Sequence, residues 1–409
     1  MRRIVFNAVS IGIVRGAPLA SRVFLLLVIA RLASPEELAQ ASFAIAIAEA
    51  LKMFGDTGID VWAVSVIGRT TGAAETSRLL SAVAVVKLLF GLIGGLLAAG
   101  LVLAFGQGGP VLAVTSGVFV LAGEAFGGPL IYHVSQETPR RLLPLSLVSL
   151  LLVPAAGVMA LLSGVPSSWA CAIVALGECA VAARALASLH ASRVLRPFHG
   201  LPSASAGVVK SVLPACAYSA TLAIYMRLDA LVLVGFSATA YATYAVAFRA
   251  VQPFSFAVGA VAMAFYSAHV RNRSGSAAAL VRTTAIFFGV TAVLAVGVYA
   301  VCAWAIGHWV SWYSGSLATL LVLCATLPVF AVNTIGFYVL AGDSRFKMIF
   351  AVVALSLLAD AALLWLLVPA QGARGAAIAL LASTLVSAVF LSCLIFRPRP
   401  LAVEERSAA

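Results

Sequence analysis

Charged residues are scarce in this chain of 409 residues. Asp, Glu, Lys and Arg together make up 10% of it, whereas hydrophobic residues make up 63%. Soluble domains are typically about a quarter charged and about half apolar. The shortage of charge and a mean hydropathy of +1.10 therefore exclude an ordinary soluble domain, and they predict an all-α integral membrane protein with many spans.

The sequence also lacks clustered cysteines and the motifs of common enzymes. Its six cysteines stand singly in apolar runs without CxxC or Cys/His spacing, so we expect buried thiols and no metal site. GxSxG, HExxH and P-loop patterns are absent, which favours a protein without catalytic activity. We expect the opening segment MRRIVFNAVSIGIV to lead into a first span rather than to be a removable signal peptide.

Twelve apolar runs are long enough to cross a membrane, which takes about 20 residues of helix. We therefore predict twelve transmembrane helices, at residues 5–31, 38–66, 78–104, 111–133, 142–163, 168–190, 208–236, 239–268, 281–306, 315–341, 347–369 and 375–396. The loops between them are short, and none is long enough for a folded soluble domain.

The basic residues in the loops, in the termini and at the ends of these runs fall almost entirely on one side of the predicted membrane. If the spans alternate in direction, 17 of these residues lie on the side of the termini, and two, Arg31 and Arg374, lie on the other side. The positive-inside rule then predicts that both termini are cytoplasmic. The same asymmetry accounts for the net charge of +12 without a nucleic-acid partner.

The longest connection lies near the middle of the chain, at residues 191–207, and is basic and then rich in small residues. Transporters are often built from two repeats with the binding site between them. We therefore predict an N-terminal six-helix lobe at 1–190, a cytoplasmic linker at 191–207, a C-terminal six-helix lobe at 208–396 and a cytoplasmic tail at 397–409.

Ionisable residues nevertheless occur inside the predicted spans, where an Arg or Asp costs about 2.5–3.5 kcal/mol on insertion scales. The basic ones are Arg15, Arg22, Lys52, Lys87, Arg184, Arg227 and Arg249. The acidic ones in or near the spans are Glu49, Asp56, Asp60, Glu124, Glu178, Asp229 and Asp360. Such groups usually face the interior of a bundle or a water-filled cavity. One open alternative is that they simply neutralise one another, across helices or within one helix, as Glu49 and Lys52 could at i and i+3.

Two pairs of these charges carry the functional prediction. Arg15 and Arg22 are two helical turns apart, so they share one face of the first span, which contains no acid. Because Arg suits bidentate contact with phosphate oxygens, this face predicts an anion-binding strip; alternatively, each Arg pairs with an acid of another helix. Arg227 and Asp229 are two residues apart and do not share a face, so at least one of them should meet another helix or a ligand.

Three segments resemble the polysaccharide flippases of the Wzx type. LLLVIARLASPEELAQASFAIAIAEALKMFGDTGID (25–60) resembles their first two helices, with an Arg, an acidic loop and a terminal D-x-G motif. IYMRLDALVLVGFSATAYATYAVAFRAVQPF (224–254) resembles their seventh and eighth helices, and LADAALLWLLVPAQGARGAAIALLAST (358–384) resembles the turn between the eleventh and twelfth. This sequence departs from the pattern at Ala39, where a Gly is usual, and at Asp360, where an Asn is common.

The resemblance implies a fold and a function. The fold would be that of the superfamily that also contains MATE drug exporters and lipid II flippases, with two six-helix lobes in a V around a central cavity. The substrate would be an undecaprenyl-diphosphate-linked oligosaccharide, moved across the bacterial inner membrane for O-antigen, capsule or exopolysaccharide synthesis. Its other partners would be membrane lipids, a polysaccharide polymerase and a chain-length regulator. Lipid II flippases usually have two more spans, which argues against a role in peptidoglycan synthesis.

The resemblance also implies which residues line the cavity. The cations that would hold the diphosphate are Arg15, Arg22, Lys52, Arg227 and Arg249. The acids that would hold these cations in place, or couple the cycle to H⁺ or Na⁺, are Asp229, Glu124, Asp360 and Glu49. No other cofactor is expected.

Two other functions compete with this one. A MATE-like exporter of small cationic compounds, driven by H⁺ or Na⁺, would have an acidic or aromatic cavity, so the basic face of the first span speaks against it. An O-antigen polymerase or ligase would need a large outer loop for its acceptor sugars, and the longest outer loop has about ten residues.

Overall fold

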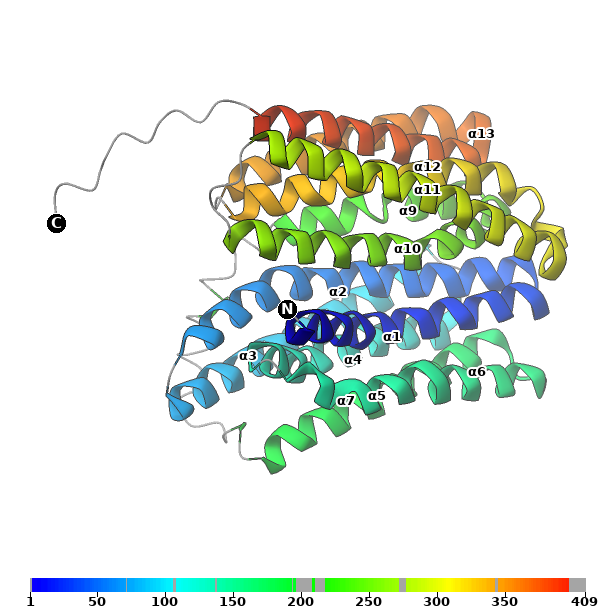
Figure 1. Cartoon of the computed structure of the whole chain (residues 1–409). Coiled ribbons are helices and arrows are strands. Elements are labelled where there is room, and N and C mark those ends of the chain that lie inside the picture. The colour runs from blue at the N-terminus through cyan, green and yellow to red at the C-terminus, as the bar shows by residue number, and fades with distance from the viewer. Residues whose placement is uncertain are drawn as a thin grey trace.

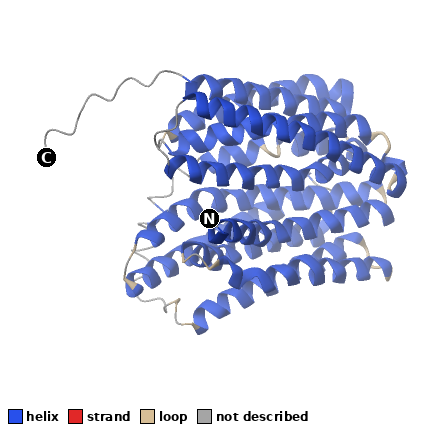
Figure 2. Cartoon of the chain, viewed as in Figure 1, coloured by secondary structure: helices blue, strands red, loops and turns tan. Residues whose placement is uncertain are grey.

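The computed structural model describes residues 2–70, 72–105, 108–136, 138–192, 194–195, 208–209, 218–271, 277–342 and 345–396. Every regular element in these ranges is a helix (Figure 2). Most of the predicted linker 191–207 and all of the predicted tail 397–409 lie outside the described residues.

The N-terminal half of the chain forms α1 (Arg2–Leu32), α2 (Pro35–Arg69), α3 (Ala73–Phe105), α4 (Gly109–Ser135), η1 (Pro139–Leu142), α5 (Leu143–Leu147), η2 (Val148–Leu152), α6 (Val153–Leu162) and α7 (Ser167–Ala191). The C-terminal half forms α9 (Leu228–Phe236), α10 (Ala238–Arg271), α11 (Ala277–Trp309), η3 (Ser311–Tyr313), α12 (Ser316–Gly342) and α13 (Phe346–Phe396). Residues 218–225, just before α9, are also helical.

The twelve spans predicted from the sequence are mainly helical where the structure describes them, and residues 210–217 of the span 208–236 lie outside the described ranges. By length and hydropathy, eight helices of the described residues could cross a membrane, and one of these, Lys347–Ile395, has 49 residues. An all-α membrane protein is therefore confirmed, while twelve crossings remain a prediction.

Local sequence signals set the ends of these helices. Ser34 caps α2: its hydroxyl accepts a hydrogen bond from the backbone N–H of Glu37, and the Glu37 side chain accepts one from the backbone N–H of Ser34. α13 is broken at Gly372, whose φ of 52° is not helical, just after Pro369. The break lies between the predicted spans 347–369 and 375–396, so α13 consists of two helical segments.

The helices form two groups that lie side by side (Figure 1). α1 to α7, coloured blue to green, make up one group, and α9 to α13, coloured green to red, make up the other. The groups meet where α10 packs against α1 and α2, and where α9 contacts α2 and α3. Any site on this boundary therefore receives side chains from both halves of the chain.

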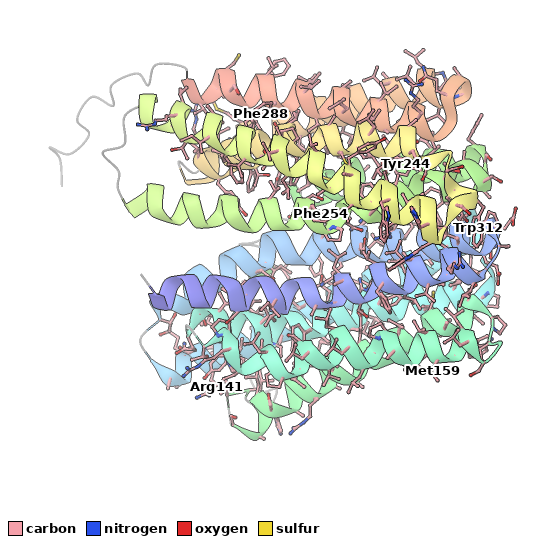
Figure 3. All side chains as sticks on the ribbon, turned by 45° about the vertical axis from the view of Figure 1, so that its right-hand side comes forward. Arg141, Met159, Tyr244, Phe254, Phe288 and Trp312 are labelled. Atoms are coloured by element: carbon pink, nitrogen blue, oxygen red, sulfur yellow. The ribbon has the colours of Figure 1, made fainter. Side chains whose placement is uncertain are left out.

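The outer faces of both groups are apolar. Met159 of α6 is 62% exposed and Trp365 of α13 is 82% exposed, and Figure 3 places Met159 and Phe288 on the outside of the bundle. Large exposed apolar side chains along whole helices are expected where the surroundings are lipid.

A second contact joins the two halves near the end of α1. The Arg31 guanidinium donates to the backbone carbonyl of Trp309 and lies over the ring of Trp312, with its Cζ 5.5 Å from the ring centroid. The Trp312 indole N–H donates to the carbonyl of Ala30 at 3.1 Å. In the predicted orientation, the C-terminal end of α1 lies at the outer side of the membrane. The contacts of Arg31 and Trp312 therefore join the two halves at the outer side.

Two glycines bring α3 and α4 into backbone contact. A Cβ built on Gly95 would lie 2.9 Å from the carbonyl oxygen of Gly117, and one built on Gly117 would lie 2.8 Å from that of Gly95. Small residues permit such close approach of membrane helices, whose association depends on packing. This contact positions α4, which carries Phe119 and Glu124 toward the buried charges described below.

We expect Gly95→Leu to lower the thermal unfolding midpoint of the purified protein in detergent by several degrees. The added side chain cannot fit against α4, and overpacking of this kind costs about 1–3 kcal/mol. Gly100→Leu is the matched control, because a Cβ at Gly100, also on α3, would meet nothing within 4 Å. Equal midpoints for the two variants would contradict the proposed backbone contact.

Candidate functional site

A single carboxylate of the N-terminal half binds side chains of the C-terminal half. Glu49 of α2 accepts a hydrogen bond from Arg227 Nη2 at 2.6 Å, and two from Arg249 Nη1 at 2.8 and 3.0 Å. Gln252 donates its amide N–H to the same carboxylate at 3.2 Å and accepts from Arg249 at 2.6 Å. The second guanidinium nitrogen of Arg249 donates to the carbonyl of Ser42 at 3.4 Å. Both arginines and Glu49 are buried, so these are ion pairs out of contact with bulk water.

Arg227 occupies a break in a helix. Its φ of −136° and ψ of 3° are not helical, and residues 226 and 227 form a turn between the helical residues 218–225 and α9. The turn contains neither proline nor glycine, so the predicted span 208–236 gave no sign of it. Discontinuous helices with charged residues at the break are typical of the binding sites of membrane transporters.

Asp229, in the first turn of α9, is bound by its own half. Its carboxylate accepts a hydrogen bond from the Tyr244 hydroxyl of α10 and another from the backbone N–H of Ala230 at 2.7 Å. The sequence predicted that at least one residue of the Arg227 and Asp229 pair would meet another helix, and both do.

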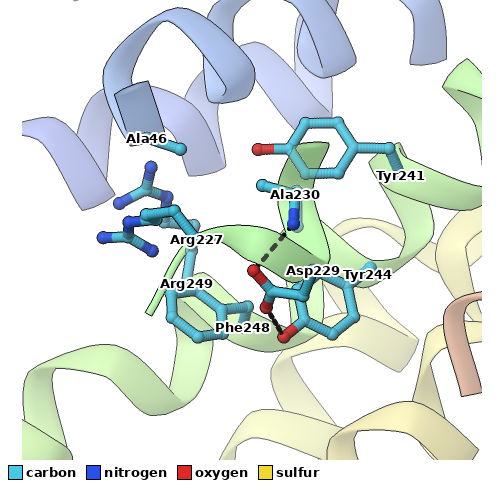
Figure 4. A pocket seen from close by; sticks show the side chains of 9 residues that line it. Ala46, Arg227, Asp229, Ala230, Tyr241, Tyr244, Phe248 and Arg249 are labelled. Carbon is cyan, nitrogen blue, oxygen red and sulfur yellow. Dashed lines mark hydrogen bonds between the residues drawn. The ribbon is translucent and has the colours of Figure 1, made fainter. Parts of the chain in front are cut away.

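A small pocket lies beside these groups (Figure 4). It is lined by Ala46, Arg227, Asp229, Ala230, Tyr241, Tyr244, Ala245, Phe248 and Arg249. In Figure 4 the guanidinium groups of Arg227 and Arg249 lie close together next to Ala46, while Asp229 and Tyr244 form another side of the pocket. The Arg227 guanidinium also lies over the Phe248 ring, 5.2 Å from its centroid, which favours a cation at this place.

Arg22 of α1 is another arginine of the predicted set. Its Nε donates to Glu178 of α7 at 3.1 Å, its Nη2 also binds that carboxylate, and its Cζ lies 4.4 Å from the centroid of the Phe119 ring. For Arg22 the structure therefore favours the alternative of a pair with an acid of another helix.

A second group of buried charges lies within the N-terminal half. The Lys87 ammonium of α3 binds Asp60 of α2 at 2.8 Å and Glu124 of α4 at 2.9 Å, and all three side chains are buried. Gly127 of α4 makes room for Lys87, because a Cβ at Gly127 would overlap Lys87 Cε. Glu124, predicted to hold a cavity arginine, thus binds a lysine elsewhere in the bundle.

A third polar group surrounds Asp360 of α13 in the C-terminal half. Ser383 donates to Asp360 Oδ1 at 3.0 Å, and the Tyr225 hydroxyl lies 3.1 Å from Ser383 Oγ and 3.3 Å from Thr384 Oγ1. Asp360 Oδ2 is buried and has no hydrogen-bond partner among the described residues. Asp229, another buried aspartate of this half, borders the pocket described above.

The structure thus brings together part of the predicted set of site residues. Arg227, Arg249 and Glu49 meet at the boundary between the halves, with Asp229 beside them, whereas Arg22 binds Glu178 within the N-terminal half. Asp360 and Glu124 lie in the separate groups just described. Lys52 lies with its stem against α4, since a Cβ at Gly123 would be 2.6 Å from Lys52 Cδ and Cε. The side chain of Arg15 lies outside the described part of the chain, although its backbone belongs to α1.

Three partners in these groups were not predicted from the sequence. Glu178 and Asp60 are acids within helices, and their locations were noted, but nothing in the sequence pairs them with Arg22 and Lys87. The sequence did not indicate Tyr244 as a partner of Asp229, because a Tyr in an apolar helix is common. Such pairings depend on how helices are rotated against one another, which hydropathy does not report.

We expect Lys87→Met to reduce the amount of folded protein strongly. The substitution leaves two buried carboxylates without their cation, and breaking a buried pair costs about 3–5 kcal/mol. The triple variant Lys87→Met, Asp60→Asn, Glu124→Gln removes all three charges and should regain most of the yield and the unfolding midpoint, measured by size-exclusion chromatography and thermal unfolding in detergent. A Lys87→Met protein as stable as the wild type would show that these ion pairs do not support the fold.

No model of a protein family matches this sequence, and no curated protein does. The fold, however, matches solved transporters. The lipid II flippase MurJ in an inward closed conformation aligns with a TM-score of 0.74 and 14% identity, over 93% of this chain and 86% of MurJ. A multidrug resistance MATE family transporter of the MOP superfamily, inward-facing, aligns with a TM-score of 0.69 and 14% identity, over 95% of this chain and 98% of that one. The MATE multidrug transporter DinF-BH aligns with a TM-score of 0.68 and 14% identity, over 97% of this chain and 96% of that one.

Identities of this size establish the fold alone. They show a fold shared with transporters of the MOP superfamily, while membership among the polysaccharide flippases remains a prediction. These neighbours are transporters and not enzymes. The chain is a multi-pass integral membrane protein with the fold of the MOP superfamily transporters.

Proposed function

We propose that this protein is a flippase that moves an undecaprenyl-diphosphate-linked oligosaccharide across the bacterial inner membrane, for O-antigen, capsule or exopolysaccharide synthesis. The observation that carries this proposal is the meeting of Arg227 and Arg249 of one half at Glu49 of the other. Guanidinium forks match phosphate oxygens, and they can replace the water that a diphosphate loses inside the membrane.

The location of these arginines suits a lipid-linked substrate. They lie at the boundary between the two groups of helices, where a head group could bind while its polyprenyl tail stays in the bilayer. The likeness of the fold to the lipid II flippase MurJ supports a lipid-linked substrate in this superfamily. In this proposal the lobes 1–190 and 208–396 move about the site, with both termini and the linker 191–207 in the cytoplasm. A polymerase and a chain-length regulator would then act on the translocated unit.

Two carboxylates are our candidates for coupling transport to a cation. Asp229 and Asp360 lie in the same half, and the buried Oδ2 of Asp360 has no hydrogen-bond partner among the described residues. Binding of H⁺ or Na⁺ would offset the repulsion between two such groups. Because Asp229 also borders the pocket, binding of H⁺ or Na⁺ at these carboxylates would change the charge next to the pocket arginines.

A MATE-like exporter of cationic compounds is the second candidate. The likeness of the fold to MATE transporters, at TM-scores of 0.69 and 0.68, favours it. Two guanidiniums on the lining of the pocket speak against it, because they would repel a cationic compound.

We expect deletion of the gene in its host to abolish the surface or secreted polysaccharide and to leave lipid-linked repeat units on the cytoplasmic leaflet. Complementation with Arg22→Ala, Arg227→Ala, Arg249→Ala or Asp229→Ala should restore little polymer. A hydrogen bond to a charged group contributes about 1.5–3 kcal/mol, so losing one should lower transport by about tenfold or more.

Arg184→Ala is the matched control, because Arg184 is a helical arginine with an exposed side chain, and it should complement fully. Protein levels in the membrane are measured for every variant, so that loss of transport is separated from loss of protein. Normal polymer together with new sensitivity to cationic dyes would contradict the flippase and favour the exporter.

A further inference from the structure

All the donors that bind Glu49 through the hydrogen bonds described above belong to the other half of the chain. Arg227 stands just before α9, and Arg249 and Gln252 lie one turn apart on α10. By contrast, the contacts of Arg22 with Glu178 and of Lys87 with its two acids stay within the N-terminal half. If the halves move relative to each other, the hydrogen bonds of Glu49 must therefore break. The ion pairs within the N-terminal half can stay intact.

The Glu49 carboxylate has the same recognition chemistry as a phosphate. Both present negatively charged oxygens to guanidinium forks and to amide N–H groups, and arginine binds both with charge-assisted hydrogen bonds. A phosphate that entered the pocket beside Arg227 and Arg249 would meet the donors that Glu49 now holds. The two anions would thus compete for one set of donors.

One donor of this set is still unused. Arg227 is 7% exposed, and its buried Nε has no hydrogen-bond partner in the described part of the chain. A buried donor without a partner is destabilising, and more so on a charged group. A diphosphate, with more oxygens than a carboxylate, could satisfy Nε together with the nitrogens that Glu49 already binds.

We propose that Glu49 is a built-in substitute for the substrate phosphate, and that a diphosphate displaces it from Arg227, Arg249 and Gln252. This inference rests on the flippase function proposed above. Displacement would remove the tie between α2 and the C-terminal half at the moment when the substrate binds. Substrate binding would then be coupled to separation of the two halves. Without substrate, the halves would stay together at Glu49.

The test measures binding of inorganic pyrophosphate to the full-length protein in lipid nanodiscs, by isothermal titration calorimetry. Glu49→Gln keeps the shape of the side chain but removes the competing charge, so it should bind pyrophosphate about tenfold more tightly than the wild type. Glu124→Gln removes another buried carboxylate, one that binds Lys87, and should bind as the wild type does. Combining Glu49→Gln with Arg249→Gln should lose the gain.

The outcomes separate the two proposals. If pyrophosphate binds in a way that depends on Arg249, but with equal affinity in Glu49→Gln and wild type, the substitute role of Glu49 is wrong and the anion site stands. If neither protein binds pyrophosphate, both the inference and the cationic site of the flippase are wrong.

A second measurement uses the native Glu49, in case the variant does not fold. Spin labels at Glu36→Cys and Thr239→Cys, exposed positions near the starts of α2 and α10, report the separation of the halves in an otherwise cysteine-free protein. Saturating pyrophosphate should shift the distance distribution to longer values, and sulfate at equal ionic strength should shift it less. An unchanged distribution at saturation would overturn the inference.

Discussion

Glu49 is the carboxylate on which the arrangement of the two halves depends. It lies on the N-terminal side of their boundary and binds two guanidiniums and an amide from the C-terminal side. Each arginine would be expensive to bury without an anion, and in a membrane the cost of an unpaired charge rises further. The contact therefore holds α2 against α10 while it neutralises the site. In our inference, a substrate diphosphate displaces Glu49 from these donors.

The other buried charges also need partners of opposite sign, but these partners lie within one half of the chain. Lys87 is enclosed by two acids, and Arg22 binds Glu178 while its ring contact with Phe119 covers one face of the guanidinium. These contacts, together with the backbone contact of α3 with α4, join helices within the N-terminal group. The contacts of Glu49, and of Arg31 at the end of α1, lie between the groups instead. The polar contacts that join the two groups are therefore distinct from those that stabilise the N-terminal group.

Hydropathy and the spacing of basic residues predicted the membrane class and the helical segments well, because burial in lipid imposes long apolar runs on the sequence. The motifs around Arg227 and Asp360 predicted the fold, which solved transporters share. The sequence also identified which charges are buried, but it did not pair them. Glu49 was considered as a partner of Lys52 on its own helix, whereas it binds Arg249, 200 residues away. The turn at Arg227 was missed as well, since no proline or glycine marks it.

Transport by the purified protein in proteoliposomes tests the central claim, that the arginines at the boundary select a lipid-linked diphosphate. The measurement follows the movement between leaflets of a short fluorescent polyprenyl-diphosphate-linked sugar, with inorganic pyrophosphate or a cationic dye as competitor. We predict that the lipid moves, that pyrophosphate slows it and that the dye has no effect. If the dye is transported while the lipid-linked sugar stays in its leaflet, the account is contradicted, and the arginines serve only to hold the two halves together.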